Sequence, residues 1–303
     1  MKKIVVIGSS NTDMVAKTER LPGRGETVLG GSFFMNQGGK GANQAVAAAR
    51  LGGDVTFIAK LGNDSFGKQA IELYKSEGIN VDYIFIDPVN PSGIALISVD
   101  RGGENSIIVA SGANANLNVE DIEKARSVIE TADIVLMQLE IPLETVEFVA
   151  KIAIEKGIKV ILNPAPAHHL PLFLLNNLYA ITPNRVEAEY LSGVEIVDLE
   201  TAKRAADAIA EKGVKHVLIT MGAEGVLIKE NSRYYMVDAE KVTVVDTTAA
   251  GDTFNGALCV GLSENMPLRE AAEFACKAAS LSVTQMGAQS SIPYRKDLKT
   301  TIK

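Results

Sequence analysis

The feature that most constrains this fold is a regular alternation of helical and strand patterns from Val119 onward. Stretches in which apolar residues recur with helical period lie between short apolar runs that favour strands. A strand, a helix and a further strand pair as a parallel unit with a right-handed crossover. The alternation therefore predicts an α/β fold, a mostly parallel sheet with helices on both faces. The expected helices span residues 119–132, 143–156, 185–191 and 199–212, and the expected strands span 134–139, 159–162, 179–182 and 216–220, before a hairpin at 225–237.

Two stretches, residues 14–38 and 93–110, depart from this alternation. The first has no amphipathic helix and carries a β-like run broken by glycines, and the second carries two β runs joined as a hairpin. We interpret both as parts of one small sheet, a lid over a ligand site. An edge extension of the main sheet is the alternative. The expected organisation is an α/β core of residues 1–13, 39–92 and 111–303 and a β-sheet lid of residues 14–38 and 93–110.

Composition and charge exclude several classes of protein. The 303 residues carry a formal net charge of −7 and no dense Lys/Arg patch, which argues against a nucleic acid as partner. No apolar segment reaches the roughly 18 residues that a membrane span needs. The first apolar run, residues 4–7, is too short for the core of a signal peptide, so we expect a cytoplasmic protein with no membrane partner. The two cysteines, Cys259 and Cys276, fall in apolar helical patterns and are expected to be buried free thiols.

Residues 242–255, VTVVDTTAAGDTFN, contain the strongest candidate for a reactive site. Residues 242–245 predict a buried strand, and a helix is expected to begin at Gly251. The unpaired N–H groups and the positive dipole end at a helix start favour an anion. Asp252 would lie beside that anion, which suits phosphoryl transfer to a hydroxyl whose proton Asp252 accepts. The alternative is an acidic residue that only complements the helix N-terminus.

Polar and glycine-rich segments also lie near the N-terminus. Asn11 and Asp13 fall in the turn expected after the first strand, where they could bind hydroxyl groups or simply form the turn. Residues 38–44, GGKGANQ, open a helix of small residues and form a second candidate site for an anion or a polar ligand. They are not a Walker A loop, because the pattern G-x-x-x-x-G-K-[ST] is absent. Lys40 could equally be a solvated loop lysine.

Further polar residues follow the expected strands at their carboxyl ends. Parallel strands end at the same edge of a sheet, so these residues should share one rim, where open α/β sheets bind ligands. Each of them taken alone could also be a surface residue. The set comprises Glu140, Asn163, Asn184, Glu187 and residues 220–225.

The last long helical pattern, residues 268–286, is nearly apolar toward its end and is expected to pack against residues 242–255. Its end would bring carbonyl and hydroxyl oxygens close to Asp246 and Thr248. Such oxygens suit a hard cation. An ordinary helix end terminated by Gly287 is the alternative.

Three motifs, taken in order, resemble the ribokinase-like family of sugar kinases. They are GGKGANQ at 38–44, NRVE at 184–187 and DTTAAGDTF at 246–254. The similarity covers essentially the whole chain. It implies a Rossmann-like α/β domain with a β-sheet lid, D-ribose and ATP as substrates, and ribose 5-phosphate as product. It further implies magnesium, activation by potassium and a homodimer joined through the lids.

The resemblance also implies roles for individual residues. Asp252 would be the base for the ribose 5-hydroxyl, with Ala249, Ala250 and Gly251 as the anion hole, and Glu187 would support the magnesium–phosphate network. The sugar contacts would be Asn11, Thr12, Asp13, Gly39, Lys40, Gly41, Ala42, Asn43, Glu140 and Asp252. The nucleotide contacts would be Asn184, Thr220, Met221, Gly222, Ala223, Glu224, Gly225, Gly251, Asp252 and Lys277. The potassium site would be Asp246, Thr248, Ser282, Gln285, Gly287 and Ser291.

One departure from the family pattern concerns the nucleotide base. An Asn or His is expected there on the last long helix, whereas this chain has Cys276 and Lys277, which leaves base selectivity open. Two other hypotheses also remain. One is a kinase of the same fold that acts on deoxyribose, a nucleoside or fructose. The other is a non-catalytic sensor of a sugar or nucleotide, against which Asp252 and the intact Ala-Ala-Gly before it argue.

Overall fold

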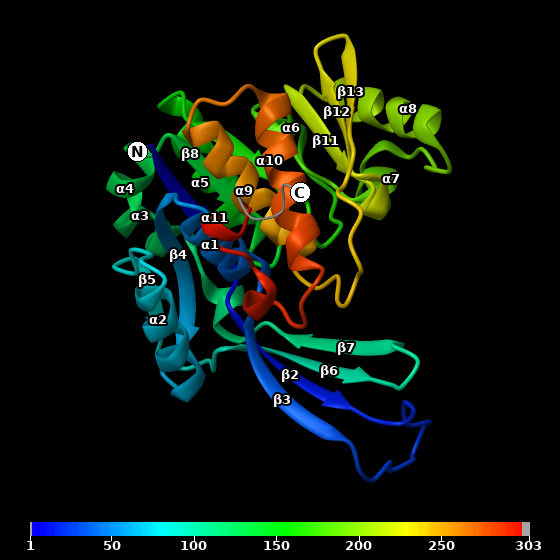
Figure 1. Ribbon diagram of the computed structural model, residues 1–303. Helices are drawn as coiled ribbons and strands as arrows, with labels where there is room; N and C mark the ends of the chain where they lie inside the picture. Colours follow the sequence, from blue (N-terminus) through cyan, green and yellow to red (C-terminus); the bar gives the residue numbers. More distant parts are fainter. Residues whose placement is uncertain (1, 299–303) are drawn as a thin grey trace.

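The structure, a computed structural model, describes residues 2–298. Within them the main sheet has nine strands in the order β13-β12-β11-β10-β9-β8-β1-β4-β5 (Figure 1). The strands from β11 to β5 pair in parallel, and β12 and β13 add an antiparallel edge. Their bounds are β1 (Lys3–Ile7), β4 (Asp54–Gly62), β5 (Ile84–Asp87), β8 (Ile134–Met137), β9 (Lys159–Leu162), β10 (Ala180–Ile181), β11 (His216–Thr220), β12 (Val226–Glu230) and β13 (Arg233–Val237).

Both faces of this sheet are buried. In β1, Ile4 and Val6 pack into one core, and Val5 and Ile7 pack into another on the opposite face. Burial on both faces explains why the strands are continuous apolar runs. The first face is covered by α1 (Lys40–Arg50), α2 (Ser65–Ser76), α9 (Ala250–Ser263), α10 (Leu268–Ser282) and α11 (Arg295–Leu298), and the second by α3 (Val119–Lys124), α4 (Arg126–Glu130), α5 (Leu143–Glu155), α6 (Leu172–Leu175), α7 (Arg185–Ser192) and α8 (Leu199–Ala210).

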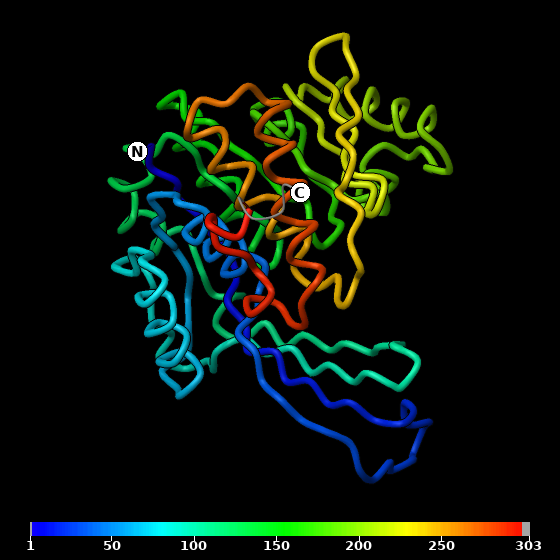
Figure 2. The backbone as a smooth tube through the Cα atoms, viewed as in Figure 1, coloured from blue at the N-terminus to red at the C-terminus, as the bar shows by residue number. Residues whose placement is uncertain are grey.

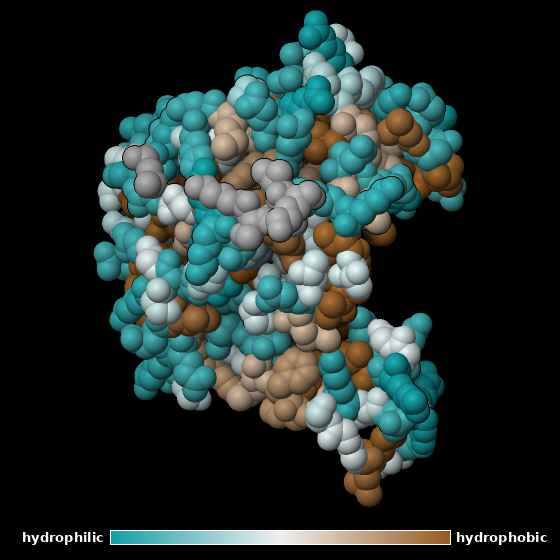
Figure 3. Space-filling model, viewed as in Figure 1, coloured by the Kyte–Doolittle hydropathy of each residue, from teal (hydrophilic) through white to brown (hydrophobic). Residues whose placement is uncertain are grey.

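A second sheet of four strands projects from this body (Figure 1). Its order is β3-β2-β6-β7, and the chain leaves the body twice to build it (Figure 2). Figure 3 shows a hollow between this sheet and the body. The strand β2 pairs with β6 in parallel, whereas the other two pairs are antiparallel. The bounds are β2 (Asn11–Lys17), β3 (Ser32–Gly38), β6 (Gly93–Val99) and β7 (Asn105–Ala110).

The predicted α/β class, a mostly parallel sheet with helices on both faces and a small sheet beside it, is confirmed. Most element bounds fall within two residues of the expected ones. Residues 11–13 differ from the expectation, because they begin β2 instead of forming a turn. The expected helix 119–132 is another, because it is divided at Ala125, whose ψ of 1° lies outside the helical range.

Two further expectations near the C-terminus were wrong. Residues 242–245 are not a strand, and Val244 and Val245 are 57% and 52% exposed. The sheet already ends at β13, so this apolar run has no partner strand and connects β13 to α9. The last long helix ends at Ser282 and not at residue 286. The Val283 carbonyl accepts the N–H groups of Val245 and Asp246 at 2.8 and 3.2 Å, which ties the helix end to the connection before α9.

Candidate active site

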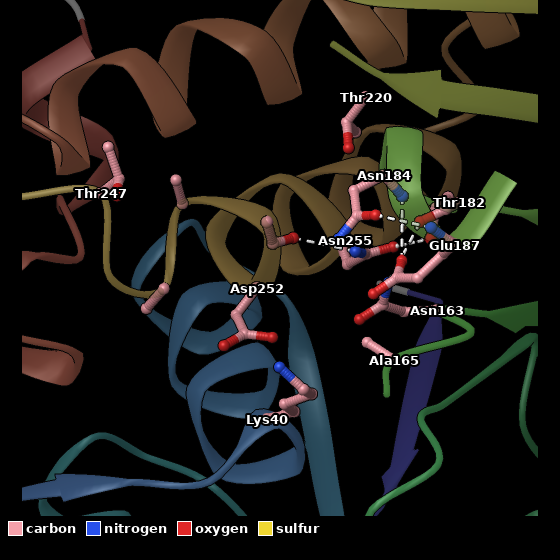
Figure 4. A pocket seen from close by; sticks show the side chains of 13 residues that line it. Lys40, Asn163, Ala165, Thr182, Asn184, Glu187, Thr220, Thr247, Asp252 and Asn255 are labelled. Carbon is pink, nitrogen blue, oxygen red and sulfur yellow. Dashed lines mark hydrogen bonds between the residues drawn. The ribbon is translucent and has the colours of Figure 1, made fainter. Parts of the chain in front are cut away.

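A cavity of about 210 Å³ lies at the carboxyl edge of the parallel sheet, where α9 begins (Figure 4). Its walls come from α1, α7, α9 and the ends of three strands, which are far apart in the sequence. Much of the predicted polar rim therefore lines one cavity. The lining residues are Lys40, Asn163, Ala165, Thr182, Asn184, Glu187, Thr220, Thr247, Ala249, Ala250, Gly251, Asp252 and Asn255.

Asp252 is the third residue of α9, and only 7% of its surface is exposed. Its Oδ2 accepts a hydrogen bond from Asn43 Nδ2 at 2.9 Å, and its Oδ1 accepts one from Gln44 Nε2 at 3.0 Å. Both amides belong to the first turn and a half of α1. Gly256 lets α1 and α9 approach, because a Cβ there would lie 2.6 Å from the Cβ of Ala47. Helix packing thus joins the GGKGANQ segment to Asp252.

The surroundings of Asp252 favour its action as a general base. Burial raises the pKa of Asp252, while Lys40 and the amides of Asn43 and Gln44 oppose this rise. Burial likewise works against a charged Lys40, but Asp252, Glu140 and other carboxylates outweigh it, so the Lys40 pKa is raised and Lys40 stays cationic. In Figure 4 the Lys40 ammonium and the Asp252 carboxylate point toward each other. A carboxylate with a raised pKa is the better proton acceptor at neutral pH.

The backbone before Asp252 can bind an anion. Ala249 adopts the left-handed conformation with φ 60°, which is uncommon for a residue with a Cβ. In residues 2–298 the N–H groups of Ala249 and Gly251 have no hydrogen-bond partner, whereas that of Ala250 donates to the Thr247 carbonyl at 3.2 Å. Two of the three N–H groups expected in the anion hole are therefore free at the cavity wall.

The residues expected to contact the sugar gather between α1, β2 and the loop after β8. Glu140 Oε2 accepts the Lys40 N–H at 3.1 Å and the Ser9 hydroxyl at 2.6 Å, so Glu140 caps the start of α1. Gly41 is needed there, because a Cβ at this position would lie 2.6 Å from the Gly8 backbone. Asn11 accepts a hydrogen bond from Asn114 at 2.8 Å. Of the remaining expected contacts, Gly39 is the N-cap of α1, while Thr12 and Ala42 are buried.

Asp13 lies on β2, and its carboxylate lies over Gly38 of the neighbouring strand β3. A Cβ on Gly38 would lie 2.2 Å from this carboxylate, so a glycine is needed there. Burial and the nearby carboxylates of Glu140 and Asp252 raise the pKa of Asp13 to about 7, although Lys40 opposes this. Asp13 therefore titrates close to neutral pH.

Asn184 and Glu187 form a capping box at the start of α7. Asn184 Oδ1 accepts the Glu187 N–H, and Glu187 Oε2 accepts the Asn184 N–H, both at 2.9 Å. This leaves Glu187 Oε1 for other partners. Burial raises the pKa of Glu187, and its side chain lies in the cavity wall with Thr220 (Figure 4).

The other residues expected to contact the nucleotide follow β11. Residues 222–224 form an exposed 3-10 turn, Glu224 pairs with Arg185, and the N–H of buried Met221 donates to the Gly225 carbonyl at 2.8 Å. Lys277 does not reach the cavity. It lines a separate open hollow between α10 and the end of β13.

The residues expected to bind potassium are brought together only in part. Asp246 Oδ1 accepts the N–H and hydroxyl of Thr248 at 2.9 and 2.6 Å, and its Oδ2 accepts the Gly287 N–H at 2.8 Å. The Ser282 and Ser291 hydroxyls donate to carbonyls of their own turns, and neither they nor Gln285 hydrogen-bond to Asp246. Asp246 thus both caps its own turn and bridges to the turn after α10.

The structure adds residues to which sequence reasoning gave no role. In the sequence, Gln44 and Asn255 fall within candidate motifs, Asn163 follows a strand, and Gln138 and Thr182 fall within expected strands, but none of these positions by itself indicates a role. All five are at least 92% buried, because none exceeds 8% exposure, and hydrogen bonds link them to Asp252 or to the turn before it. Extending the search for polar strand ends to Gln138 and Thr182 would have found two of them.

Comparison with known proteins decides the family. Residues 1–295 match the pfkB family of carbohydrate kinases. The chain belongs to this family. The family model describes carbohydrate kinases.

Individual relatives agree over nearly the whole chain. A ribokinase of Haemophilus influenzae is 45% identical across 98% of this chain and 97% of its own length. A deoxyribokinase of Salmonella typhi is 37% identical across 96% of this chain and 95% of its own. The structure of Arabidopsis thaliana ribokinase with ribose and ATP superposes with a TM-score of 0.92 at 33% identity, covering 100% of this chain and 99% of that one.

Proposed function

We propose that this pfkB family member transfers the γ-phosphoryl group of ATP to the 5-hydroxyl of D-ribose, giving ribose 5-phosphate and ADP. The observation that carries the proposal is the buried Asp252 carboxylate beside the free N–H groups that begin α9. The similarity to ribokinases over nearly the whole chain supports ribose and ATP as the substrates.

The chemistry follows from the positions of these groups. The ribose 5-oxygen attacks the γ-phosphorus, the bond from that phosphorus to the β–γ bridging oxygen breaks, and ADP leaves with the bond electrons. Asp252 takes the hydroxyl proton. The N–H groups of Ala249 and Gly251 stabilise the charge on the transferring group. Lys40, whose pKa the nearby carboxylates raise, adds a positive charge beside Asp252.

Magnesium and potassium would bind at two different places, magnesium at Glu187 and potassium at Asp246. Residues 2–298 contain no group of three or more His, Cys, Asp or Glu side chains that could hold a metal ion. Magnesium often relies on substrate phosphates and one or two carboxylates, and the remaining oxygen of Glu187 can serve it directly or through water. When bound, magnesium would neutralise phosphate charge. Potassium would join Asp246 to the turn after α10 and so steady the backbone before Ala249.

The projecting sheet supports a lid and a homodimer. Cross-strand pairing places Met35, Met14, Leu96 and Ile108 in one row, on the face opposite to the Asp13 side chain. Met35 and Ile108 are 50% and 66% exposed, and Phe33 of the same face is 62% exposed. Such a row is a natural contact with the same sheet of a second copy.

The compartment is also part of the proposal. No helix in the described part of the chain is long and apolar enough to cross a membrane. Cys259 and Cys276 are free and buried, which suits a reducing compartment such as the cytoplasm.

Replacement of Asp252 tests the function. Asp252→Asn keeps the shape of the side chain but cannot accept the proton, so turnover should fall by roughly 10²–10⁴-fold. Ribose affinity, measured by calorimetry without ATP, should change little. The exposed Asp54, at the opposite edge of the sheet, provides the control Asp54→Asn. An Asp252→Asn enzyme with turnover near that of the wild type would show that Asp252 is not the base.

A second candidate function is phosphorylation of deoxyribose. It rests on the 37% identity to a deoxyribokinase, which is not far below the identity to ribokinases. Side-by-side kinetics with ribose, 2-deoxyribose, fructose and a nucleoside separate these candidates. A sensor without catalysis would phosphorylate none of them.

A further inference from the structure

We propose that Gln44 is a positioning residue for Asp252, held in one orientation by Gln138 and Asn163, and that it sets the pH at which the base works. The proposal rests on the assignment of Asp252 as the base. It concerns a buried chain of side-chain amides that lies behind the carboxylate.

The chain of hydrogen bonds follows the carboxyl edge of the sheet. Gln44 Nε2 donates to Asp252 Oδ1 at 3.0 Å and to Asn163 Oδ1 at 3.2 Å. Gln138 Nε2 donates to Gln44 Oε1 at 2.6 Å. Asn163 Nδ2 donates to the Thr182 carbonyl at 3.1 Å. Gln138 directly follows β8, and Asn163 and Thr182 directly follow β9 and β10, so three neighbouring strands anchor the chain.

The direction of this chain is fixed from both ends. The ionised Asp252 carboxylate and the Thr182 carbonyl have no proton to donate, so each can only accept hydrogen bonds. Asn163 must therefore turn its nitrogen to Thr182 and its oxygen to Gln44. Gln44 in turn must offer its nitrogen to both Asn163 and Asp252, which leaves its oxygen for Gln138. The opposite orientation of Gln44 would place its oxygen against two other oxygens.

Burial makes this contact permanent. Gln44 and Gln138 are both 0% exposed, so water cannot take the place of either amide. The Gln138 oxygen is buried without a partner, which costs free energy. The hydrogen bond from the Gln138 nitrogen to Gln44 helps to offset this cost. Asn43, the second donor to Asp252, belongs to the residues expected to contact the sugar and can exchange its bond when the sugar binds. Gln44 is therefore the donor that stays.

A permanent donor affects how readily Asp252 takes a proton. A hydrogen bond to the charged form of a carboxylate favours that form. Gln44 lowers the pKa of Asp252 against the rise that burial causes. The charged groups that face Asp252 are Lys40 on α1, Glu140 after β8, Asp13 on β2 and Glu187 on α7, and a change at Gln44 leaves all of them in place.

The experiment measures turnover against pH, at saturating ribose and ATP, for variants that remove single amides. Gln44→Met keeps the length of the side chain and removes its donors. The acid limb of the profile should move up by roughly one pH unit, with about tenfold lower turnover on that limb and recovery on the alkaline plateau. Gln138→Met leaves Gln44 in place without its fixed orientation and should give a smaller shift in the same direction.

Controls separate positioning from stability. Val46→Ala removes fully buried apolar atoms from the same helix without touching the amides. It should lower the melting temperature and leave the acid limb unchanged. The double variant Gln44→Met/Gln138→Met should have the same acid limb as Gln44→Met alone, because Gln138 acts on Asp252 only through Gln44.

Two results would overturn the inference. One is a Gln44→Met enzyme whose acid limb coincides with that of the wild type, whatever its melting temperature. The other is a Gln138→Met enzyme with an unchanged limb, which decides the question even if Gln44→Met does not fold. A failure of the proposed function looks different, since Asp252→Asn would then keep its turnover.

Discussion

The raised pKa of Asp13 leads to a prediction about how ribose binding depends on pH. Burial, Glu140 and Asp252 raise the pKa of this carboxyl to about 7, whereas Lys40 lowers it. A sugar hydroxyl donates to the ionised carboxylate, so only the ionised fraction of the protein is ready to bind. That fraction is roughly one-tenth at pH 6 and nine-tenths at pH 8. Apparent affinity scales with the competent fraction, so ribose should bind roughly tenfold more weakly at pH 6 than at pH 8.

Calorimetry of ribose binding without ATP measures this effect directly, because ribose does not titrate in this range. Asp13→Asn is the control, and it should bind ribose more weakly and with little dependence on pH. Glu140→Gln removes a neighbouring negative charge, so the midpoint should move to lower pH. Dissociation constants equal within about twofold from pH 6 to 8 would refute the reasoning. An Asp13→Asn protein that keeps the pH dependence of the wild type would refute it as well.

Thermal unfolding without sugar provides an independent check on Asp13. The unfolded chain releases this proton near pH 4, whereas the folded chain keeps it up to about pH 7. Between these values the folded state binds more protons, so stability from this group falls as pH rises. Asp13→Asn should therefore raise the melting temperature more at pH 8 than at pH 4. An equal change at both pH values would contradict a raised pKa.

Three other predictions concern the ion, the sugar and the assembly. Potassium should raise turnover at saturating substrates more than sodium does, and Asp246→Ala should abolish most of that response while ribose affinity stays nearly unchanged. Full activity in potassium-free buffer, unchanged on adding potassium, would leave Asp246 only its capping role. If Asp13 contacts the 2-hydroxyl, ribose should exceed 2-deoxyribose in kcat/KM by at least roughly tenfold, and equal values would exclude that contact. Ile108→Lys should convert a dimer to monomers in analytical ultracentrifugation, whereas a wild-type monomer would disprove the sheet-to-sheet contact.

The sequence was enough to predict the class of fold and several of the polar residues that meet at the carboxyl edge of the sheet. Continuous apolar strands alternating with amphipathic helices leave few arrangements other than a parallel sheet covered on both faces, as β1 illustrates. In such a sheet, the polar residues after the strands must meet at one edge, which is why Asn163, Asn184 and Thr220 line one cavity with Asp252. Local periodicity and the direction of the strands carry this information.

Local patterns failed where distant segments decide the outcome. Residues 242–245 have the composition of a strand, but β13 already forms the edge of the sheet and no partner strand remains. The last long helix, α10, stops at Ser282, where the carbonyl of the next residue accepts hydrogen bonds from the segment before α9. Each of these depends on what surrounds the segment in space.

The surroundings of Asp252 and Asp13 are likewise a product of the tertiary structure. The sequence provides the two carboxylates and the amides, but burial and the charges that converge from α1, β2, α7 and the loop after β8 set their pKa values. Gln44, Gln138 and Asn163 are separated by up to 119 positions, yet hydrogen bonds join them behind the base. A pKa depends on the local dielectric and on the distances to other charges, and these are set only once α1 and α9 have packed against each other on one face of the sheet.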